Sequence, residues 1–170
     1  MIRLLNLKEV DSTNNYCKSL IYSNPHIEDT IVISRVQTAG RGRLYKRVWV
    51  SVVGNFHGSY IINIGKFGIK EEATTILASR LLIAVHKFLG NLTQSDQLLI
   101  KLPNDILVKD KKLSGILVEI IYPFAVIGIG INLTVSAVKT STNLKKEFKI
   151  LIKPVEIARD LYEALIKEII

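Results

Sequence analysis

The chain has 170 residues, of which 48% are hydrophobic and 22% charged, so its length and composition exclude a disordered chain and favour a single globular domain over residues 1–170. Its formal net charge of +8, from 23 basic and 15 acidic side chains, favours an anionic partner such as nucleic acid, a nucleotide or an acidic protein. The single cysteine, Cys17, excludes an internal disulfide and a cysteine-rich metal centre and fits a cytoplasmic location, and no apolar run of about 20 residues predicts a membrane span.

The first half of the chain combines predicted strands with one helix. Ser12 or Thr13 suits the N-cap of that helix, because a hydroxyl accepts an unpaired backbone N–H group, and Asn24 and Pro25 end it. Runs of β-branched residues between turn signals predict the strands. The expected strands are residues 2–10, 30–36, 48–51 and 56–64, with a turn at residues 54–55 between the last two.

The second half begins with the clearest helix, residues 71–89, which is expected to end at Gly90. Its apolar stripe consists of Ile76, Leu77, Leu81, Val85, Phe88 and Leu89. Four strands are expected next, at residues 97–102, 105–108, 113–121 and 125–133, with a hairpin tip at residues 109–112 that lacks the usual Asn-Gly pair. Pro154 suits the first turn of a last helix, residues 154–169, which buries Ala158, Leu161, Tyr162, Leu165 and Ile169. This order of elements predicts an α+β fold, a mixed β-sheet with helices packed on one side.

The segment from Gln37 to Trp49, QTAGRGRLYKRVW, places positive charge on pliable backbone. Gly40 and Gly42 let the main chain approach a ligand closely, and arginine offers a rigid fork of donors to phosphate or carboxylate. The segment predicts a loop that closes over a phosphate-containing ligand; a mobile basic loop and an RNA-contacting segment are the alternatives. Its basic residues are Arg41, Arg43, Lys46 and Arg47.

The segment KLPNDILVKDKKLSGILVEI, residues 101–120, carries a second group of polar residues. Pro103 breaks the strand, so Asn104 and Asp105 lie at a bend, where they either hold Mg²⁺ or cap the backbone of a turn. Lys112 enters an apolar strand, so its side chain either reaches back to solvent or points into a site. Gly115 indicates a close approach of another group to the backbone.

Two further stretches have polar or small residues at informative positions. Gly128 and Gly130 interrupt a β-branched strand, which indicates that they make space for another group, and Asn132 at its end is placed to bind a ligand. The stretch 11–14 is either a plain helix cap or a set of groups for a polar ligand head. No metal spacing and no nucleophile with a base partner is evident among Cys17 and the histidines, which are His26, His57 and His86.

Six short stretches follow one another in a recognisable order between residues 9 and 133. They are DSTN at 11–14, QTAGRGR at 37–43 with Trp49, Ser51 with Gly54 and Asn55, KLPND at 101–105, KKLSGILVE at 111–119 and GIGIN at 128–132. In this order they resemble the motifs of the biotin protein ligase family. The resemblance implies the biotin/lipoate protein ligase catalytic-domain type of fold.

The resemblance implies a two-step reaction with biotin and ATP as substrates and Mg²⁺ as metal. Biotin would attack the α-phosphate of ATP to give biotinyl-5′-AMP, and a lysine of a biotin carboxyl carrier domain would then attack the anhydride. The implied catalytic residues are Lys112, Arg41 and Arg43, and the implied biotin-binding residues are Ser12, Thr13, Asn14, Gln37, Gly42, Lys112 and Gly115. The implied nucleotide-binding residues are Arg41, Arg43, Trp49, Asn104 and Asn132, and Asp105 is the candidate magnesium ligand.

The chemistry agrees with these roles, since both reactants are anions and the cations would offset their repulsion. The sequence departs from the family pattern at Leu102, where tryptophan is usual, at residues 56–58, which are usually more apolar, and in the basic loop, which is one residue longer. We expect neither an N-terminal DNA-binding domain nor a C-terminal β-barrel in this chain, and therefore no DNA partner. We expect no membrane partner, because no apolar run is long enough to span a membrane. A homodimer through an exposed strand edge is compatible with the sequence.

Three alternatives remain open on the sequence. One is a ligase for another carboxylate, such as lipoate, and one is a degenerate relative that binds biotin without transferring it. The third, of another class, is a basic nucleic-acid-binding domain that uses residues 41–47, 109–112 and 145–149.

Overall fold

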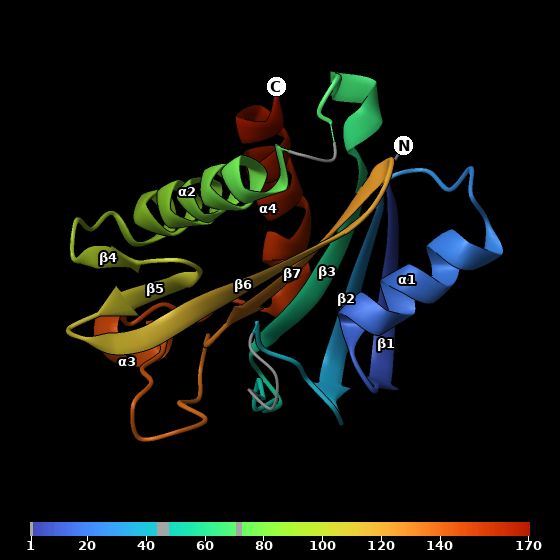
Figure 1. Cartoon of the computed structure of the whole chain (residues 1–170). Helices are drawn as coiled ribbons and strands as arrows, with labels where there is room; N and C mark the ends of the chain where they lie inside the picture. The colour runs from blue at the N-terminus through green and yellow to red at the C-terminus, as the bar shows by residue number, and fades with distance from the viewer. Residues whose placement is uncertain (1, 44–47, 71–72) are drawn as a thin grey trace.

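The chain forms one sheet with helices on both faces (Figure 1). The structure, a computed structural model, describes residues 2–43, 48–70 and 73–170. In chain order the elements are β1 (Arg3–Val10), α1 (Thr13–Ser23), β2 (Thr30–Gln37), β3 (Phe56–Asn63), the 3₁₀ helix η1 (Ile64–Phe67), α2 (Thr74–Thr93), β4 (Leu98–Lys101), β5 (Asp105–Val108), β6 (Lys111–Ile121), β7 (Phe124–Ile131), α3 (Leu144–Phe148) and α4 (Pro154–Ile169).

The sheet has seven strands in the order β1-β2-β3-β7-β6-β5-β4. β1 and β2 are parallel and are joined through α1, whereas every other neighbouring pair is antiparallel, which confirms the mixed sheet. β5 and β6 are joined by a two-residue turn at Lys109 and Asp110, whose φ angles of 49° and 61° give the turn its left-handed conformation without an Asn-Gly pair. β1 and β4 form the two edges of the sheet.

The helices cover different faces, because alternate residues of each strand point to opposite sides. Ile31 and Ile33 of β2 belong to the main core under α2 and α4, whereas Val32 packs with Cys17 and Ile21 of α1. In Figure 1, α1 lies in front of β1–β3 and α4 behind them. The expectation of helices on one side therefore holds for α2, α3 and α4 and is wrong for α1.

Other boundaries differ from the sequence prediction. Residues 48–51 form no strand, and Val48 makes only an isolated bridge to Arg41. Gly90 does not end α2; the helix continues to Thr93 and ends at Gln94 in the left-handed conformation, because Leu92 extends the packed apolar side by another turn.

The apolar side of α2 also starts later than expected. Ile76 is 67% exposed, whereas the stripe from Leu77 to Leu89 packs into the core as predicted. Residues Ile76–Thr93 satisfy length and composition criteria for a membrane span. Their packing against the sheet and α4 is that of a core helix in a globular domain. α4 matches its predicted span, and Tyr162 on it is half-buried, with its hydroxyl donating to Asp29 (2.8 Å).

Candidate functional site

A cleft lies on the α1 face of the sheet, where the N-terminus of α1 meets the end of β2 and the middle of β6 and β7. Segments distant in sequence contribute to it, which is typical of a ligand site on a rigid scaffold. Most residues that the resemblance assigned to biotin or nucleotide line this cleft. They are Ser12, Thr13, Asn14, Gln37, Arg41, Gly42, Trp49, Asn104, Lys112 and Gly115, joined by Leu117, Gly128 and Gly130 among others.

The N-terminus of α1 forms one wall. Ser12 is the N-cap, and its hydroxyl accepts the N–H of Asn15 (3.5 Å). Capping starts the helix here, so Thr13 and Asn14 fall in its first turn and are buried against the sheet. The Thr13 N–H and hydroxyl both reach Oε1 of Gln37, at 2.8 and 3.0 Å. Both alternatives for residues 11–14 are therefore partly realised: they cap a helix and line a cleft.

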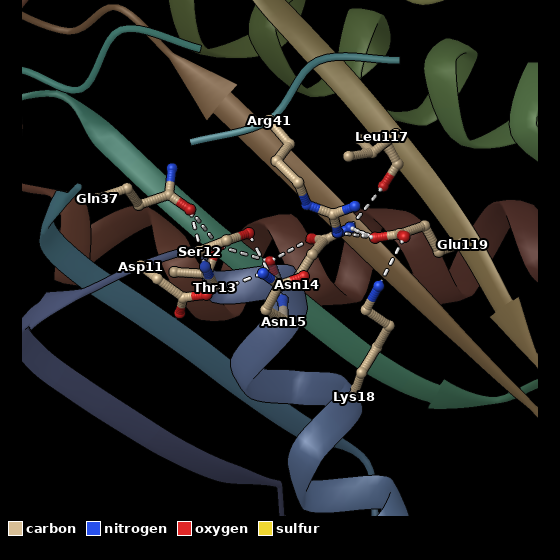
Figure 2. Close-up of polar contacts among 11 residues, drawn as sticks. Asp11, Ser12, Thr13, Asn14, Asn15, Lys18, Gln37, Arg41, Leu117 and Glu119 are labelled. Carbon is tan, nitrogen blue, oxygen red and sulfur yellow. Dashed lines mark hydrogen bonds and ion pairs between the residues drawn. The ribbon is translucent and has the colours of Figure 1, made fainter. Parts of the chain in front are cut away.

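A continuous row of hydrogen bonds runs from this wall to β6 (Figure 2). The Ser59 hydroxyl on β3 lies 2.7 Å from the Thr13 hydroxyl and 2.6 Å from Oδ1 of Asn14. Nδ2 of Asn14 donates to Glu119 (2.8 Å) and to the carbonyl of Leu117 (3.3 Å). We call Gln37, Thr13, Ser59, Asn14 and Glu119 the polar row.

Two cations converge on the Glu119 end of the polar row (Figure 2). Arg41 contacts one carboxylate oxygen at 2.6 Å, and Lys18 contacts the other at 2.9 Å. Burial alone would raise the pKa of Glu119, but the hydrogen bonds from Asn14, Lys18 and Arg41 outweigh it and hold the pKa below its ordinary value. Glu119 is therefore ionised and accepts hydrogen bonds only.

Ser59, Lys18 and Glu119 had no predicted role. The only available signal was an acidic residue inside the apolar strand LSGILVEII. The partners of Glu119 lie 78 to 105 residues away along the chain, so no local pattern marks them.

Glycines form the floor of the cleft, where side chains of other segments sit directly on the backbone. A Cβ atom on Gly128 would lie 2.3 Å from Oδ1 of Asn14, and one on Gly130 would lie 2.4 Å from the Trp49 ring. A Cβ on Gly115 would lie 2.9 Å from Nζ of Lys112. The interpretation that these glycines make space is confirmed.

Lys112 points into the cleft rather than out to solvent. Its Nζ lies 2.7 Å from Oδ1 of Asp105 and 5.5 Å from the centre of the Trp49 ring. The Oδ1 atom is buried, and the ammonium meets it as an ion pair without hydrogen-bond geometry. The ammonium is thus held by one carboxylate and one aromatic face, with its side chain still 33% exposed.

Trp49 is fixed by a histidine that sequence analysis left without a role. The indole N–H donates to Nδ1 of His57 (3.1 Å), and Nε2 of His57 lies 3.1 Å from the carbonyl of Val52. Since Nδ1 accepts, the hydrogen is on Nε2 and the ring is neutral. Burial lowers the pKa of His57 more than the Val52 carbonyl raises it. The change from the family pattern at residues 56–58 thus places an acceptor behind Trp49.

A second pocket adjoins the cleft and shares Trp49 and Lys112 with it. Its remaining lining is Val48, Val50, Asn132, Ala137, Val138 and Ser141. Asn132 is buried, with Nδ2 donating to the carbonyl of Lys112 (3.3 Å) and Oδ1 accepting from Asn55 (3.3 Å). In this conformation Asn132 therefore links the side chain of Asn55 to the backbone of Lys112 at the floor of the pocket.

Arg43 does not line the cleft. Arg43 lines a neighbouring cavity with Pro103 and Asn104, so its contact with phosphate stays a prediction. Lys46 and Arg47 lie outside the described residues. Within the described ranges, no group of three or more His, Cys, Asp or Glu side chains is arranged to hold a metal.

Known proteins match both the sequence and the fold. Residues 7–135 match the biotin/lipoate A/B protein ligase family. The biotin–[acetyl-CoA-carboxylase] ligase of Mycobacterium tuberculosis is 31% identical over 130 residues, which are 74% of this chain and 47% of that protein. The bifunctional ligase/repressor BirA of Bacillus subtilis is 39% identical over 112 residues, which are 62% of this chain and 33% of that protein. The match thus spans less than half the length of either relative.

Solved structures of this type superpose on nearly the whole chain. A biotin protein ligase from Aquifex aeolicus, in complex with biotin and ATP, has a TM-score of 0.81 and 28% identity over 98% of this chain and 70% of that one. A biotin protein ligase from Leishmania major, in complex with biotinyl-5-AMP, has a TM-score of 0.80 at 24% identity and shares the fold.

Proposed function

The chain belongs to the biotin/lipoate A/B protein ligase family, and we propose that it activates biotin with ATP and transfers it to a carrier-protein lysine. The first step gives biotinyl-5′-AMP and pyrophosphate. The second transfers the biotinyl group to the amine and releases AMP. The acceptor we propose is a biotin carboxyl carrier domain of an acetyl-CoA carboxylase or a related carboxylase.

One observation carries the proposal: the cleft joins an uncharged polar wall to a cationic one. Thr13, Asn14 and Gln37 offer hydroxyl and amide groups at the end where a ureido ring would bind. Lys112 and Arg41 bring positive charge to the same cleft, where a carboxylate and a phosphate would meet. A neutral polar head and an anionic tail on one ligand match this division.

Lys112 would act by electrostatic stabilisation. Its ammonium is preorganised against Asp105 and Trp49, so little reorganisation is needed when negative charge develops on the α-phosphate. No protein nucleophile is required, because the carboxylate of biotin attacks. The second pocket, with Trp49 as the shared wall and Val50 and Val138 as apolar lining, would take the nucleoside of ATP.

Among the described residues no group of three or more potential metal ligands is present, and Asp105 is the carboxylate that lies against Lys112. Asp105 pairs with Lys112, and Mg²⁺ in nucleotide sites is commonly held by one or two carboxylates together with phosphate oxygens. Asp105 therefore fits a metal that arrives with ATP. Bound there, Mg²⁺ would neutralise phosphate charge.

The nucleic-acid alternative has less support. Lys109, a basic residue on which only this alternative depends, is already paired with Glu147. Paired cations release fewer counterions from a phosphate backbone than free ones. Trp49, an aromatic residue close in sequence to the basic stretch at residues 41–47, is engaged by His57.

The test is to incubate the protein with labelled biotin, MgATP and a carrier domain, and to follow pyrophosphate release and carrier labelling. We expect both in the wild type, loss of both in Lys112→Ala, and retention of both in Lys167→Ala, an exposed lysine of α4. Adenylate without carrier labelling would favour the degenerate relative, and activation of lipoate in place of biotin would favour a lipoate ligase. Absence of any biotin-dependent pyrophosphate release would refute the proposal.

A further inference from the structure

Four residues form a row across the sheet, one from each of the strands β3, β7, β6 and β5. Each is the register partner of the next, so their side-chain positions lie next to one another on the face of the sheet that carries the cleft. In order they are His57, Gly130, Gly115 and Asp105, and we call them the cross-strand row. The two outer members have polar side chains, whereas the two inner members have none.

The half of the row on β3 and β7 holds the ring of Trp49. A Cβ atom on Gly130 would lie 2.4 Å from that ring, so the indole packs directly on the glycine backbone. Beside it, Nδ1 of His57 accepts the indole N–H at 3.1 Å. His57 is buried, and its Nε2 lies 3.1 Å from the carbonyl of Val52, so the acceptor is itself held in place.

The half of the row on β6 and β5 holds Lys112 in a similar manner. A Cβ atom on Gly115 would lie 2.9 Å from Nζ of Lys112, and Oδ1 of Asp105 lies 2.7 Å from the same nitrogen. The ammonium is 5.5 Å from the centre of the Trp49 ring. Because Asp105 holds it independently, the ammonium stays in the cleft even if the indole moves.

The position of Trp49 depends on the contacts of its ring. The residue lies outside every strand, and its backbone N–H donates to the carbonyl of Gly40 (3.0 Å). Over the parts of the chain that the structure describes, the bond to His57 is the one hydrogen bond that the indole makes. A hydrogen bond is directional and packing on a glycine is not, so this bond selects one rotational state of the ring.

The ring of Trp49 borders two neighbouring spaces. It lines both the cleft and the second pocket, and among the described residues of the second pocket it is the one aromatic side chain. An aromatic face binds a nucleobase by stacking, which requires that the ring present its face to the base. The orientation of the indole therefore decides how well the second pocket holds a nucleoside.

We infer that His57 is a positioning residue for the nucleotide. By accepting the indole N–H, it holds the Trp49 ring in the orientation that forms the wall of the second pocket. His57 lines neither the cleft nor the second pocket, so it acts on the substrate through Trp49 alone. This inference rests on the proposed function and adds a residue that sets the affinity for ATP.

Two substitutions at one position isolate the acceptor. His57→Leu and His57→Asn both lose the bond to the Val52 carbonyl, but Asn keeps an oxygen at the place of Nδ1 and Leu has no acceptor. We expect the KM for ATP to rise about 10-fold in His57→Leu, the effect of leaving one donor unpaired, and less than about threefold in His57→Asn. The Kd for biotin should change less than about threefold in both, because the polar wall of Thr13, Asn14 and Gln37 keeps its hydrogen bonds.

Trp49→Phe separates this role from a merely structural one. Phenylalanine keeps an aromatic ring on Gly130 and has no N–H, so no donor is left for residue 57 to position. In the Trp49→Phe background, His57→Leu and His57→Asn should therefore give KM values for ATP within about twofold of each other.

The measurements are the KM for ATP in biotin-dependent pyrophosphate release and the Kd for biotin by calorimetry, and circular dichroism checks that each variant folds. Acrylamide quenching of Trp49, the only tryptophan, should increase in His57→Leu and stay at the wild-type level in His57→Asn. His86→Leu is the matched control. The half-buried His86 has a ring nitrogen 3.0 Å from the Leu98 carbonyl and lines neither space, so this substitution should leave the KM for ATP unchanged.

The outcomes separate the inference from the proposed function. Equal KM values for ATP in His57→Leu and His57→Asn would overturn the inference, and so would a difference that persists in the Trp49→Phe background. Either result leaves the proposed function intact. Absence of biotin-dependent pyrophosphate release from the wild type would overturn both.

Discussion

The buried histidine behind Trp49 makes stability depend on pH in a way that one substitution can isolate. His57 is 1% exposed and neutral, and both ring nitrogens are hydrogen-bonded. A second hydrogen on Nδ1 would face the indole N–H and would bury a charge, while Lys112 carries another positive charge 5.5 Å from the centre of the Trp49 ring. Folding therefore disfavours protonation, as the lowered pKa indicates.

The sign and size of the effect follow from proton linkage. The unfolded chain begins to bind a proton at His57 as the pH falls through 6.5, the ordinary histidine value, while the folded chain does not. The contribution of neutral His57 to stability is complete above that pH. It is lost below it at up to about 1.4 kcal/mol per pH unit, until the folded pKa is reached.

His57→Asn removes the titration and keeps an acceptor, because Oδ1 of Asn occupies the place of Nδ1. The variant loses the bond to Val52, which costs about 1 kcal/mol at every pH. The assay is urea unfolding between about pH 7.5 and 5, followed by the fluorescence of Trp49, the only tryptophan. Other titrating groups cancel in the difference between the two proteins. A difference that does not change with pH would refute the reasoning.

Three further outcomes are expected. Lys112→Ala should slow adenylate formation about 10²- to 10³-fold, the usual effect of removing one preorganised stabilising group, with folding measured by circular dichroism unchanged. Gly128→Ala should lose biotin binding by calorimetry and about 1–3 kcal/mol in urea unfolding, because its Cβ would lie 2.3 Å from Oδ1 of Asn14; undiminished binding would contradict the packed floor. Leu161→Ala should cost about 2–5 kcal/mol in the same unfolding assay, since Leu161 is fully buried in the core, and a loss below about 1 kcal/mol would contradict that packing.

Much of the scaffold follows from local sequence. Alternating apolar residues and turn signals predict β5 to β7 as consecutive strands, and the spacing of Leu161, Leu165 and Ile169 predicts α4. The prediction that the second helix ends at Gly90 is wrong, because a glycine within a helix cannot be told from one at its end by sequence alone. Packing of Leu92 decides between them, and that contact is not local.

The residues of the site likewise fall into some that the local sequence predicts and others that only the fold brings together. Gly128, Gly130 and Lys112 are recognisable because each is unusual in a β-branched or apolar strand. Ser59 and His57 are ordinary strand residues, and their partners depend on which strands become neighbours. The pairing of Ser59 with Thr13 spans 46 residues, so it appears only when β3 and α1 are in place.

The central position of β7 affects the order in which the sheet is assembled during folding. Residues 124–131 are the seam between a sub-sheet of β1–β3 and another of β4–β6. Asn14 and Ser59 belong to the first and Glu119 and Lys112 to the second, so during translation the cleft is assembled only after β7 has been made. Its long-range pairing is among the slower events of folding. Two fragments divided between β3 and α2 would each hold part of the cleft, and β7 would join them together with α4, whose Ala158 and Tyr162 hydrogen-bond to Tyr60 and Asp29.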